Sequence, residues 1–298
     1  MKNYVIIFSV LVFVLFLNAC NTKKPSSKEN NSTNEKSIYL GQKLPGLIPE
    51  PFAPGIVTTK DYEYSGTFSP DLQEFYFIRD GGDLDEASLV QLKNNNGKWK
   101  ESILSKWVGQ PVISPDGNTM HLGRRYMERN GKGWSEVKEL KAPFNDIPIM
   151  RLSVSASGTY YFDTYDKNKP DFPMRYSRCI DGEYEFPKEL NKTINKAIKN
   201  LNHPFIAPDE SYLLWDAVKE EGYGSSDIYI SFKQEDNTWS KAIHLGDKIN
   251  TESWEASASV TPDGKYLFFS RNMGSDQYEN VDIFWVSTQV LEKLRPKK

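Results

Sequence analysis

An all-β fold built from repeated four-stranded units is predicted by three features of this 298-residue sequence. Five segments each contain a short alternating strand, a tight turn and a second strand rich in aromatic and branched residues, the pattern of a β-hairpin. Two further strand-like runs follow most of these hairpins. The turns recur at intervals close to the roughly 40–50-residue period of propeller blades. We therefore predict a β-propeller. The turn positions are Pro70, Pro115, Ala156, Pro208 and Pro262.

The five hairpins align along their whole length. They read "SGTFSPDLQEFYFIR" (65–79), "QPVISPDGNTMHLGR" (110–124), "RLSVSASGTYYFDTY" (151–165), "HPFIAPDESYLLW" (203–215) and "SASVTPDGKYLFFSR" (257–271). Third strands are predicted at 226–232 and 281–287, where apolar residues alternate. An aromatic residue opens several fourth strands. Because Trp99, Trp134 and Trp239 recur at one position of the unit, we interpret them as packing residues rather than a sugar platform.

Closure of the ring is predicted to use both ends of the chain. Residues 257–288 supply only three strands of a fifth unit. Residues 49–71 align with residues 241–263, which matches Glu63 to Glu255, so we expect residues 50–58 to supply the missing outer strand. Propellers commonly hide their end blades by pairing strands from both termini. We predict five four-stranded blades closed by an N-terminal strand, with a sixth blade as the alternative. The run 188–200 has apolar residues at helical spacing, and we favour a linking strand and loop there, with a short helical insertion as the alternative.

The N-terminus is predicted to be a lipoprotein signal, residues 1–19. A basic start precedes an apolar run over 4–17, which is shorter than the roughly 20 residues of a membrane-spanning helix. "LNAC" resembles a lipobox, with Leu17 at −3, Ala19 at −1 and Cys20 as the lipidated residue. The alternative is an ordinary cleaved signal. If Cys20 carries lipid, Cys179 has no disulfide partner, and we interpret it as a small buried residue.

Residues 20–37 are predicted to form a disordered tether, because after Cys20 they contain no large apolar side chain. The remaining residues, 38–298, suffice for one propeller domain. The net charge is −3 and charges of both signs are interspersed, so we expect no nucleic-acid partner and membrane contact only through the lipid. We expect a monomer, exported and held at the outer membrane, in the periplasm or at the cell surface.

The "SPDG" and "TPDGKYLFFS" units resemble the PD40, or TolB-type, WD40-like propeller repeat of exported lipoproteins. The resemblance covers residues 50–288, and the run 239–251 is similar to a linker of that group. Two repeats depart from the pattern, with "SASG" at 155–158 and "SPDLQ" at 69–73. The resemblance implies a propeller that binds an envelope protein or a glycan without catalysis.

A candidate ligand site follows from propeller geometry. The first strand of a blade begins, and its second strand ends, at the same face around the central channel, so polar residues at those positions crowd together. The position five residues before each turn is occupied by Ser65, Gln110, Arg151, His203 and Ser257. Their mixed charge suits a small polar or anionic ligand such as an acidic sugar; the alternative is that neighbouring Arg and Asp side chains simply pair. The candidate residues are Glu63, Gln110, Arg124, Arg151, Asp163, Tyr165, His203, Asp216, Glu255 and Arg271.

Chemistry at this site is left open by the sequence. His121 and His244 do not occupy positions equivalent to His203, so we expect no metal site. No Gly-rich phosphate loop, paired-Cys zinc spacing or G-x-S-x-G motif is present, and we expect no cofactor. As a lone histidine at the channel face, His203 would serve as a general base or ligand donor, or cap a carboxylate. Pairs such as Asp163 with Asp216 have the residue types of glycosidase catalysis.

Two functions therefore remain, and no catalytic residue is assigned. The first is a lipid-anchored binding or scaffold module for an envelope protein or oligosaccharide. The second is a carbohydrate-active enzyme, a polysaccharide lyase or glycoside hydrolase. An open pocket around the predicted residues favours the enzyme, whereas closed ion pairs favour the binding module.

Overall fold

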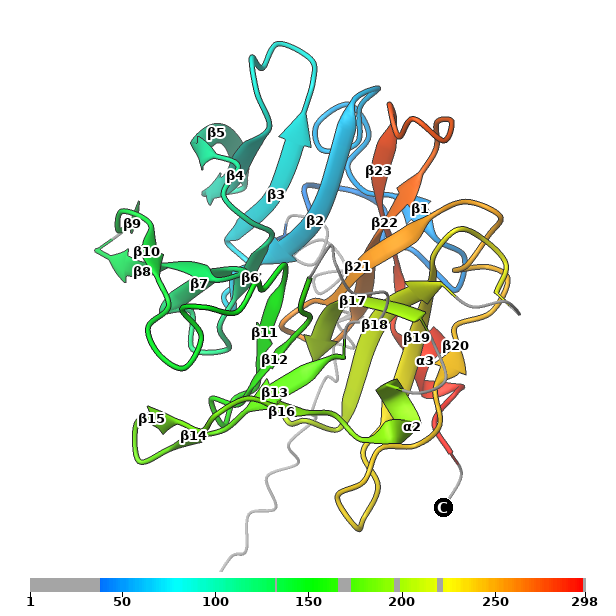
Figure 1. Ribbon diagram of the computed structural model, residues 1–298. Coiled ribbons are helices and arrows are strands. Elements are labelled where there is room, and N and C mark those ends of the chain that lie inside the picture. Colours follow the sequence, from blue (N-terminus) through cyan, green and yellow to red (C-terminus); the bar gives the residue numbers. More distant parts are fainter. Residues whose placement is uncertain (1–37, 132, 166–172, 196–198, 219–221, 297–298) are drawn as a thin grey trace, which may run out of the picture.

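The computed structural model describes residues 38–131, 133–165, 173–195, 199–218 and 222–296 (Figure 1). These residues form an all-β fold in which two single-turn helices, α2 (Lys192–Asn195) and α3 (Gln289–Glu292), are the only named helical elements described. Neither helix is long enough to cross a membrane, and no other described helix is. The predicted signal peptide, the lipidated Cys20 and the tether up to residue 37 lie outside the described residues.

We divide most of the strands into five groups with antiparallel pairing, numbered units 1 to 5 (Figure 1). Units 1 and 5 belong to one eight-stranded sheet, because Tyr62 of β2 pairs in parallel with Val281 of β23. Unit 1 is β2 (Tyr62–Phe68), β3 (Glu74–Asp80), β4 (Ser88–Asn95) and β5 (Lys98–Lys106). Unit 2 is β6 (Pro111–Ile113), β7 (Thr119–Leu122), β8 (Arg125–Asn130) and β10 (Lys138–Glu139), with β9 (Gly133–Trp134) also on β8. Unit 3 is β11 (Leu152–Val154), β12 (Tyr160–Phe162), β13 (Arg175–Ser177) and β16 (Lys188–Glu189).

Unit 4 is β17 (Lys199–Ile206), β18 (Tyr212–Val218), β19 (Asp227–Phe232) and β20 (Ile243–His244). Unit 5 is β21 (Glu255–Val260), β22 (Tyr266–Asn272), β23 (Val281–Ser287) and β1 (Glu50–Pro51). A separate hairpin, β14 (Cys179–Ile180) with β15 (Glu183–Tyr184), extends from unit 3. Contacts join β2 to β6, β7 to β11, β11 to β17, β17 to β21, and β21 back to β2.

Strand β1 comes from the N-terminal side of the domain and pairs with the C-terminal strand β23. Glu50 lies opposite Trp285, and the next backbone N–H, that of Phe52, donates to the Ile283 carbonyl at 2.8 Å. The Phe52 ring is fully buried and lies 5.1 Å from the Trp285 ring and 4.8 Å from the Phe268 ring. Apolar burial therefore holds together the two ends of the chain.

Hydrophobic clusters lie between neighbouring units, because each sheet is apolar on both faces. Strand β18 shows this alternation. Trp215 packs with residues of unit 3, whereas Leu214 on the opposite face packs with residues of unit 5. Trp99, Trp134 and Trp239 each pack against one of these clusters, which confirms their predicted packing role.

A β-bulge interrupts the innermost strand of three units at the same position. Ser65, His203 and Ser257 have φ values of +60°, +51° and +56°, and the strand register shifts around each of them. A bulge removes one residue from the ladder, so its N–H points elsewhere. All three residues are among those that the sequence places at the channel.

The run 188–200 contains strand and helix together. It includes β16, then α2, and the first residues of β17. Ile194 of α2 is fully buried and Leu190 nearly so. The short helical insertion that the sequence left as an alternative is therefore present, because its apolar residues pack into the cluster between units 3 and 4.

Candidate functional site

The inner strands define two ends of the central axis. We call the end that carries the turns between first and second strands the turn face, and the opposite end, where the chain enters each first strand, the linker face. Four inner-strand residues meet between these ends around the side chain of Gln110. Its Oε1 accepts from Ser65 Oγ at 3.2 Å, from Ser257 Oγ at 3.2 Å and from Arg151 Nη1 at 3.5 Å. The structure thus brings together four of the five residues that stand five positions before their turns.

The bulge N–H groups donate to polar side chains that lie near the end of the second strand of the preceding unit. His203 N–H donates to Asp163 Oδ2 at 2.8 Å, and Ser257 N–H donates to Asp216 Oδ1 at 2.9 Å. Ser65 N–H donates to Ser270 Oγ at 3.1 Å. The same contact therefore links units 3 to 4, 4 to 5 and 5 to 1, and it satisfies backbone donors that the bulges release.

Asp163 is a fully buried carboxylate that is held by the backbone. Besides the His203 N–H, it accepts from the N–H groups of Met150 at 3.2 Å and Arg151 at 2.8 Å. Burial raises its pKa, while the nearby His203 and these N–H groups act in the opposite direction. Every described donor to Asp163 is a backbone group, so its role in this arrangement is to join strands.

Asp216 is the second fully buried carboxylate, and it holds the His203 ring. His203 Nδ1 lies 2.9 Å from Asp216 Oδ1, and Ser226 Oγ donates to Oδ2 at 3.4 Å. The pairing fixes the orientation of the imidazole, which is the third role that the sequence left open for this histidine.

Glu63 and Glu255 form two equivalent clamps at the linker face. Glu63 accepts from Thr59 N–H at 3.1 Å and pairs with Arg79 Nε at 3.1 Å. Glu255 accepts from Thr251 N–H at 2.9 Å and pairs with Arg271 Nε at 2.9 Å. Each arginine also donates to a backbone carbonyl of the segment that leads into its unit. The pKa of both glutamates is raised above its usual value, because burial outweighs the opposing effect of the threonine and arginine donors.

Arg124 and Tyr165 lie apart from this network. They line a cleft of about 340 Å³ at the linker face of units 2 and 3, together with Trp107 and Arg125. Trp107 and Tyr165 are 51% and 55% exposed, so both rings offer a face to a ligand. Sequence reasoning missed Trp107, although it stands in a short "SKWVG" segment just before an inner strand.

A second cavity, of about 390 Å³, opens on the turn face along the central axis. Its walls are largely apolar, with Val154, Phe205 and Val260 among them, and Arg151 and Ser153 contribute polar atoms. Arg151 is 1% exposed, and burial lowers its pKa to about 10. This cavity was not predicted, because the sequence analysis placed the open mouth at the linker face.

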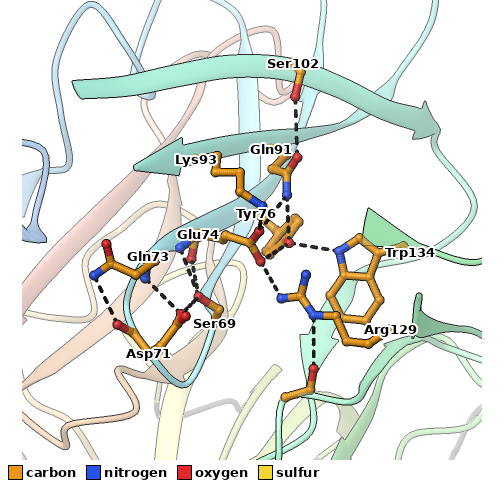
Figure 2. A network of polar contacts seen from close by, with 11 residues as sticks. Ser69, Asp71, Gln73, Glu74, Tyr76, Gln91, Lys93, Ser102, Arg129 and Trp134 are labelled. Atoms are coloured by element: carbon orange, nitrogen blue, oxygen red, sulfur yellow. Dashed lines mark hydrogen bonds and ion pairs between the residues drawn. The ribbon is translucent and has the colours of Figure 1, made fainter. Parts of the chain in front are cut away.

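A hollow of about 440 Å³ between units 1 and 2 contains a polar network around Glu74 (Figure 2). Glu74 accepts from Lys93 Nζ at 2.6 Å, from Tyr76 Oη at 2.7 Å and from the Arg129 guanidinium. The guanidinium also stacks on the Trp134 ring, 4.0 Å from its centroid. Burial acts to raise the pKa of Glu74, but these three donors outweigh it and hold the pKa below its usual range. The network is saturated and joins the two units.

A further hollow, of about 640 Å³, lies between units 3 and 4, and Glu210, one of its two acidic residues, is also fully hydrogen-bonded. Glu210 accepts from Lys233 Nζ at 2.8 Å, Ser157 Oγ at 2.9 Å and Tyr161 Oη at 3.1 Å. Burial acts to raise the pKa of Glu210, but hydrogen bonds, that from Lys233 first, outweigh it and lower the pKa to about 2. The carboxylate therefore stays ionised and engaged.

The three histidines lie in separate places. His121 is buried in β7 against the Tyr160 ring, and burial lowers its pKa to about 4. His244 contacts Asn250 in the linker after β20. Among the residues that the structure describes, no three His, Cys, Asp or Glu side chains group as metal ligands.

Comparison with known proteins finds similarity to solved structures at low sequence identity. No family model matches the sequence, and no curated protein sequence matches it. TolB from Acinetobacter baumannii is 13% identical over 76% of this chain and 57% of its own, with a TM-score of 0.46. A GH62 α-L-arabinofuranosidase catalytic domain from Coprinopsis cinerea is 9% identical over 81% and 97%, with a TM-score of 0.47. A thermostable family-43 glycoside hydrolase is 13% identical over 77% and 90%, with a TM-score of 0.47.

Proposed function

We propose that this chain is an exported, lipid-anchored β-propeller of the PD40/TolB type that acts as a non-catalytic binding module for an envelope protein or a glycan. In this proposal units 1 to 5 are five blades, and β1 closes the ring by completing unit 5. The circular order of contacts between units supports five blades, since β21 of the last unit contacts β2 of the first. The pairing of β1 with β23 supports the closure.

The closed state of the axial carboxylates is the observation that carries the binding role. Glu63 and Glu255 are clamped by arginines, Asp163 is held by three backbone N–H groups, and Asp216 is held by His203 and Ser257. Each of the four is 0% exposed. Glycosidase catalysis needs two carboxyl groups that face the scissile bond, roughly 5–10 Å apart with room for a sugar. These carboxylates instead join strands, while the linker-face cleft is lined by the aromatic residues Trp107 and Tyr165 and by arginines.

The experiment that tests the binding role combines a ligand screen with a turnover assay. Purified full-length protein in mild detergent is screened by thermal shift against neutral and acidic oligosaccharides, with and without chelator, and used as bait in envelope extracts. We expect a saturable ligand or one stoichiometric partner, and no release of reducing ends or unsaturated uronates. Turnover at a rate well above that of heat-inactivated protein would overturn the non-catalytic role.

A second function, a carbohydrate-active enzyme, is favoured by one contact. The His203 ring is oriented by a buried carboxylate, as a general base must be. If the protein is an enzyme, His203→Gln abolishes turnover while the unfolding midpoint changes little. A turnover that survives this substitution rules out His203 as the base.

The lipid anchor at Cys20 is tested separately from ligand binding. We expect the full chain to incorporate radiolabelled palmitate and to partition into the detergent phase of Triton X-114. Cys20→Ser removes both properties if the lipobox interpretation is right. An unlabelled wild-type chain would favour the ordinary cleaved signal.

A further inference from the structure

The cavity on the turn face combines a largely apolar wall with one buried cation. Its volume of about 390 Å³ is within the usual range for small-molecule sites. The wall includes Val154, Phe205 and Val260, and prolines of the hairpin turns form part of the rim. Such a surface favours a hydrocarbon group over water. A charged side chain, that of Arg151, is therefore unusual in this lining.

Arg151 is held by weak, neutral contacts only. Its Nη1 donates to Ser65 Oγ at 3.3 Å and Gln110 Oε1 at 3.5 Å, and its Nη2 donates to the Ala258 carbonyl at 3.4 Å. All three distances lie beyond the usual range for such bonds. Within the described part of the chain, Nε has no hydrogen-bond partner and the guanidinium has no ion pair. Buried arginines are normally paired.

The carboxylates near Arg151 do not form the missing ion pair with it. Asp163 and Asp216 act on its charge through space and favour the charged form. Their oxygens, however, accept from backbone N–H groups and from His203, as described above. The guanidinium therefore retains donor capacity at the inner end of an open cavity.

Ser153 supplies a second donor in the lining of the same cavity. Ser153 Oγ accepts from the Ile206 N–H at 3.0 Å, and its own hydroxyl proton has no acceptor among the described residues. A planar guanidinium binds a carboxylate with two parallel hydrogen bonds, and a hydroxyl supplies a third. The floor thus matches a single carboxylate, and the walls match an apolar group attached to it.

We propose that the turn-face cavity binds a carboxylate carried on an apolar group, with Arg151 and Ser153 binding the carboxylate and the apolar wall binding the remainder. This deepens the proposed binding function and rests on it. Two sources have this chemistry, a free apolar acid and the C-terminal residue of a protein chain.

Calorimetric titration of the purified full chain tests the proposal with four probes. They are 4-phenylbutyrate, its neutral amide, a pentapeptide ending in Phe with a free carboxylate, and the same pentapeptide amidated. A charge-assisted hydrogen bond is worth about 1.5–3 kcal/mol, so each acid should bind at least about tenfold more tightly than its amide. Binding of the peptide acid identifies a chain terminus as a fitting ligand, and binding of phenylbutyrate alone identifies a small acid.

Two substitutions in the cavity and one control substitution distinguish binding in the cavity from nonspecific binding elsewhere. Arg151→Met removes the charge at similar length, and Val260→Trp fills the cavity while keeping the arginine at position 151. Both should abolish the preference for acids, whereas Lys100→Met on the exposed strand β5 should leave it intact. Circular dichroism confirms that each variant is folded.

The proposal is overturned if no acid binds, if acid and amide bind alike, or if Arg151→Met retains the preference for acids. These failures leave the wider binding function standing whenever the wild-type chain still captures an oligosaccharide or envelope partner. Loss of every ligand and partner, together with turnover, would overturn the proposed function itself.

Discussion

The two halves of the central axis use the same residue types in opposite ways. Toward the linker face, arginines pair with buried glutamates, and buried aspartates accept from backbone N–H groups and His203. Toward the turn face, Arg151 is buried without an ion pair among the described residues and lines an open cavity. A charged residue at an inner-strand position is thus either a structural connection or a ligand group, and its hydrogen-bond partners decide which.

The largest loss of stability is expected at Asp216, in the half of the axis near the linker face, where the charged groups are paired. Asp216→Ala removes the acceptor for the His203 ring, the Ser257 N–H and the Ser226 hydroxyl, and leaves three buried donors unpaired. We expect the free energy of unfolding at pH 7 to fall by about 3–5 kcal/mol. Urea unfolding measures this loss. Asp276→Ala, at an exposed carboxylate of the β22–β23 connection, is the control and should change it little.

The next largest loss of stability is expected at the two Glu–Arg clamps. Arg271→Met leaves Glu255 buried without its cation, and the free energy of unfolding at pH 7 should fall by about 3 kcal/mol. Arg79→Met should behave alike, because Glu63 has the same contacts. An equal change in the exposed Arg295, paired with Glu292, should have little effect.

The pH dependence of the clamp variants has a definite sign. Burial already raises the pKa of Glu255, and removing Arg271 raises it further. The folded state then binds a proton more tightly than the unfolded state, so lowering the pH restores stability. We expect the defect of Arg271→Met to be smaller at pH 5 than at pH 7. A defect that grows on acidification would contradict the assigned burial of the charge.

A smaller effect is expected at Asp282 on β23, which is 8% exposed and has an Oδ1 atom without a hydrogen-bond partner. Burial, with the nearby Glu63, raises its pKa to about 6. Because the folded pKa lies above the ordinary value, this group lowers the free energy of unfolding as pH rises from about 4 to 6. Asp282→Asn should raise stability at pH 7.5 by about 1 kcal/mol and make no difference at pH 4. An unchanged denaturation midpoint at pH 7.5 would refute this.

The smallest change in stability is expected at Arg151, in the half of the axis near the turn-face cavity. Replacing a buried arginine that has no ion pair by an apolar residue of similar length removes an uncompensated desolvation cost. Arg151→Met should therefore change the free energy of unfolding by less than about 1 kcal/mol, in either direction. A loss of stability as large as that of Asp216→Ala would show that Arg151 has a structural role, like the paired residues near the linker face.

Most of the fold was predictable because it is repetitive. Alternating apolar residues around the SPDG-like turns correctly located the strands β21–β22, and the aromatic residues after them correctly located packing positions. The alignment of Glu63 with Glu255 also predicted that both would sit in equivalent surroundings. Residues 188–200 were harder, because a four-residue helix between two strands has too few residues for a helical period to outweigh strand alternation.

The candidate site was predicted only in part. Counting back from each turn correctly grouped Ser65, Gln110, Arg151 and Ser257, because strands of equal register bring equal positions together. Counting did not show that the carboxylates there would already be hydrogen-bonded, since their donors include backbone N–H groups, two of them at bulges, and side chains of other segments. Nor did it separate Arg124 and Tyr165 into their own cleft with Trp107.

The sequence by itself determined the all-β class, the repeat, the packing positions and the set of polar residues that meet on the axis. These properties depend on local periodicity and on spacing along the chain, which a single sequence records. Only the tertiary structure decided which of those residues are paired and which end of the axis is open. Pairing depends on ångström-scale contacts between different units, and the positive φ of three bulge residues redirects the N–H groups that make them.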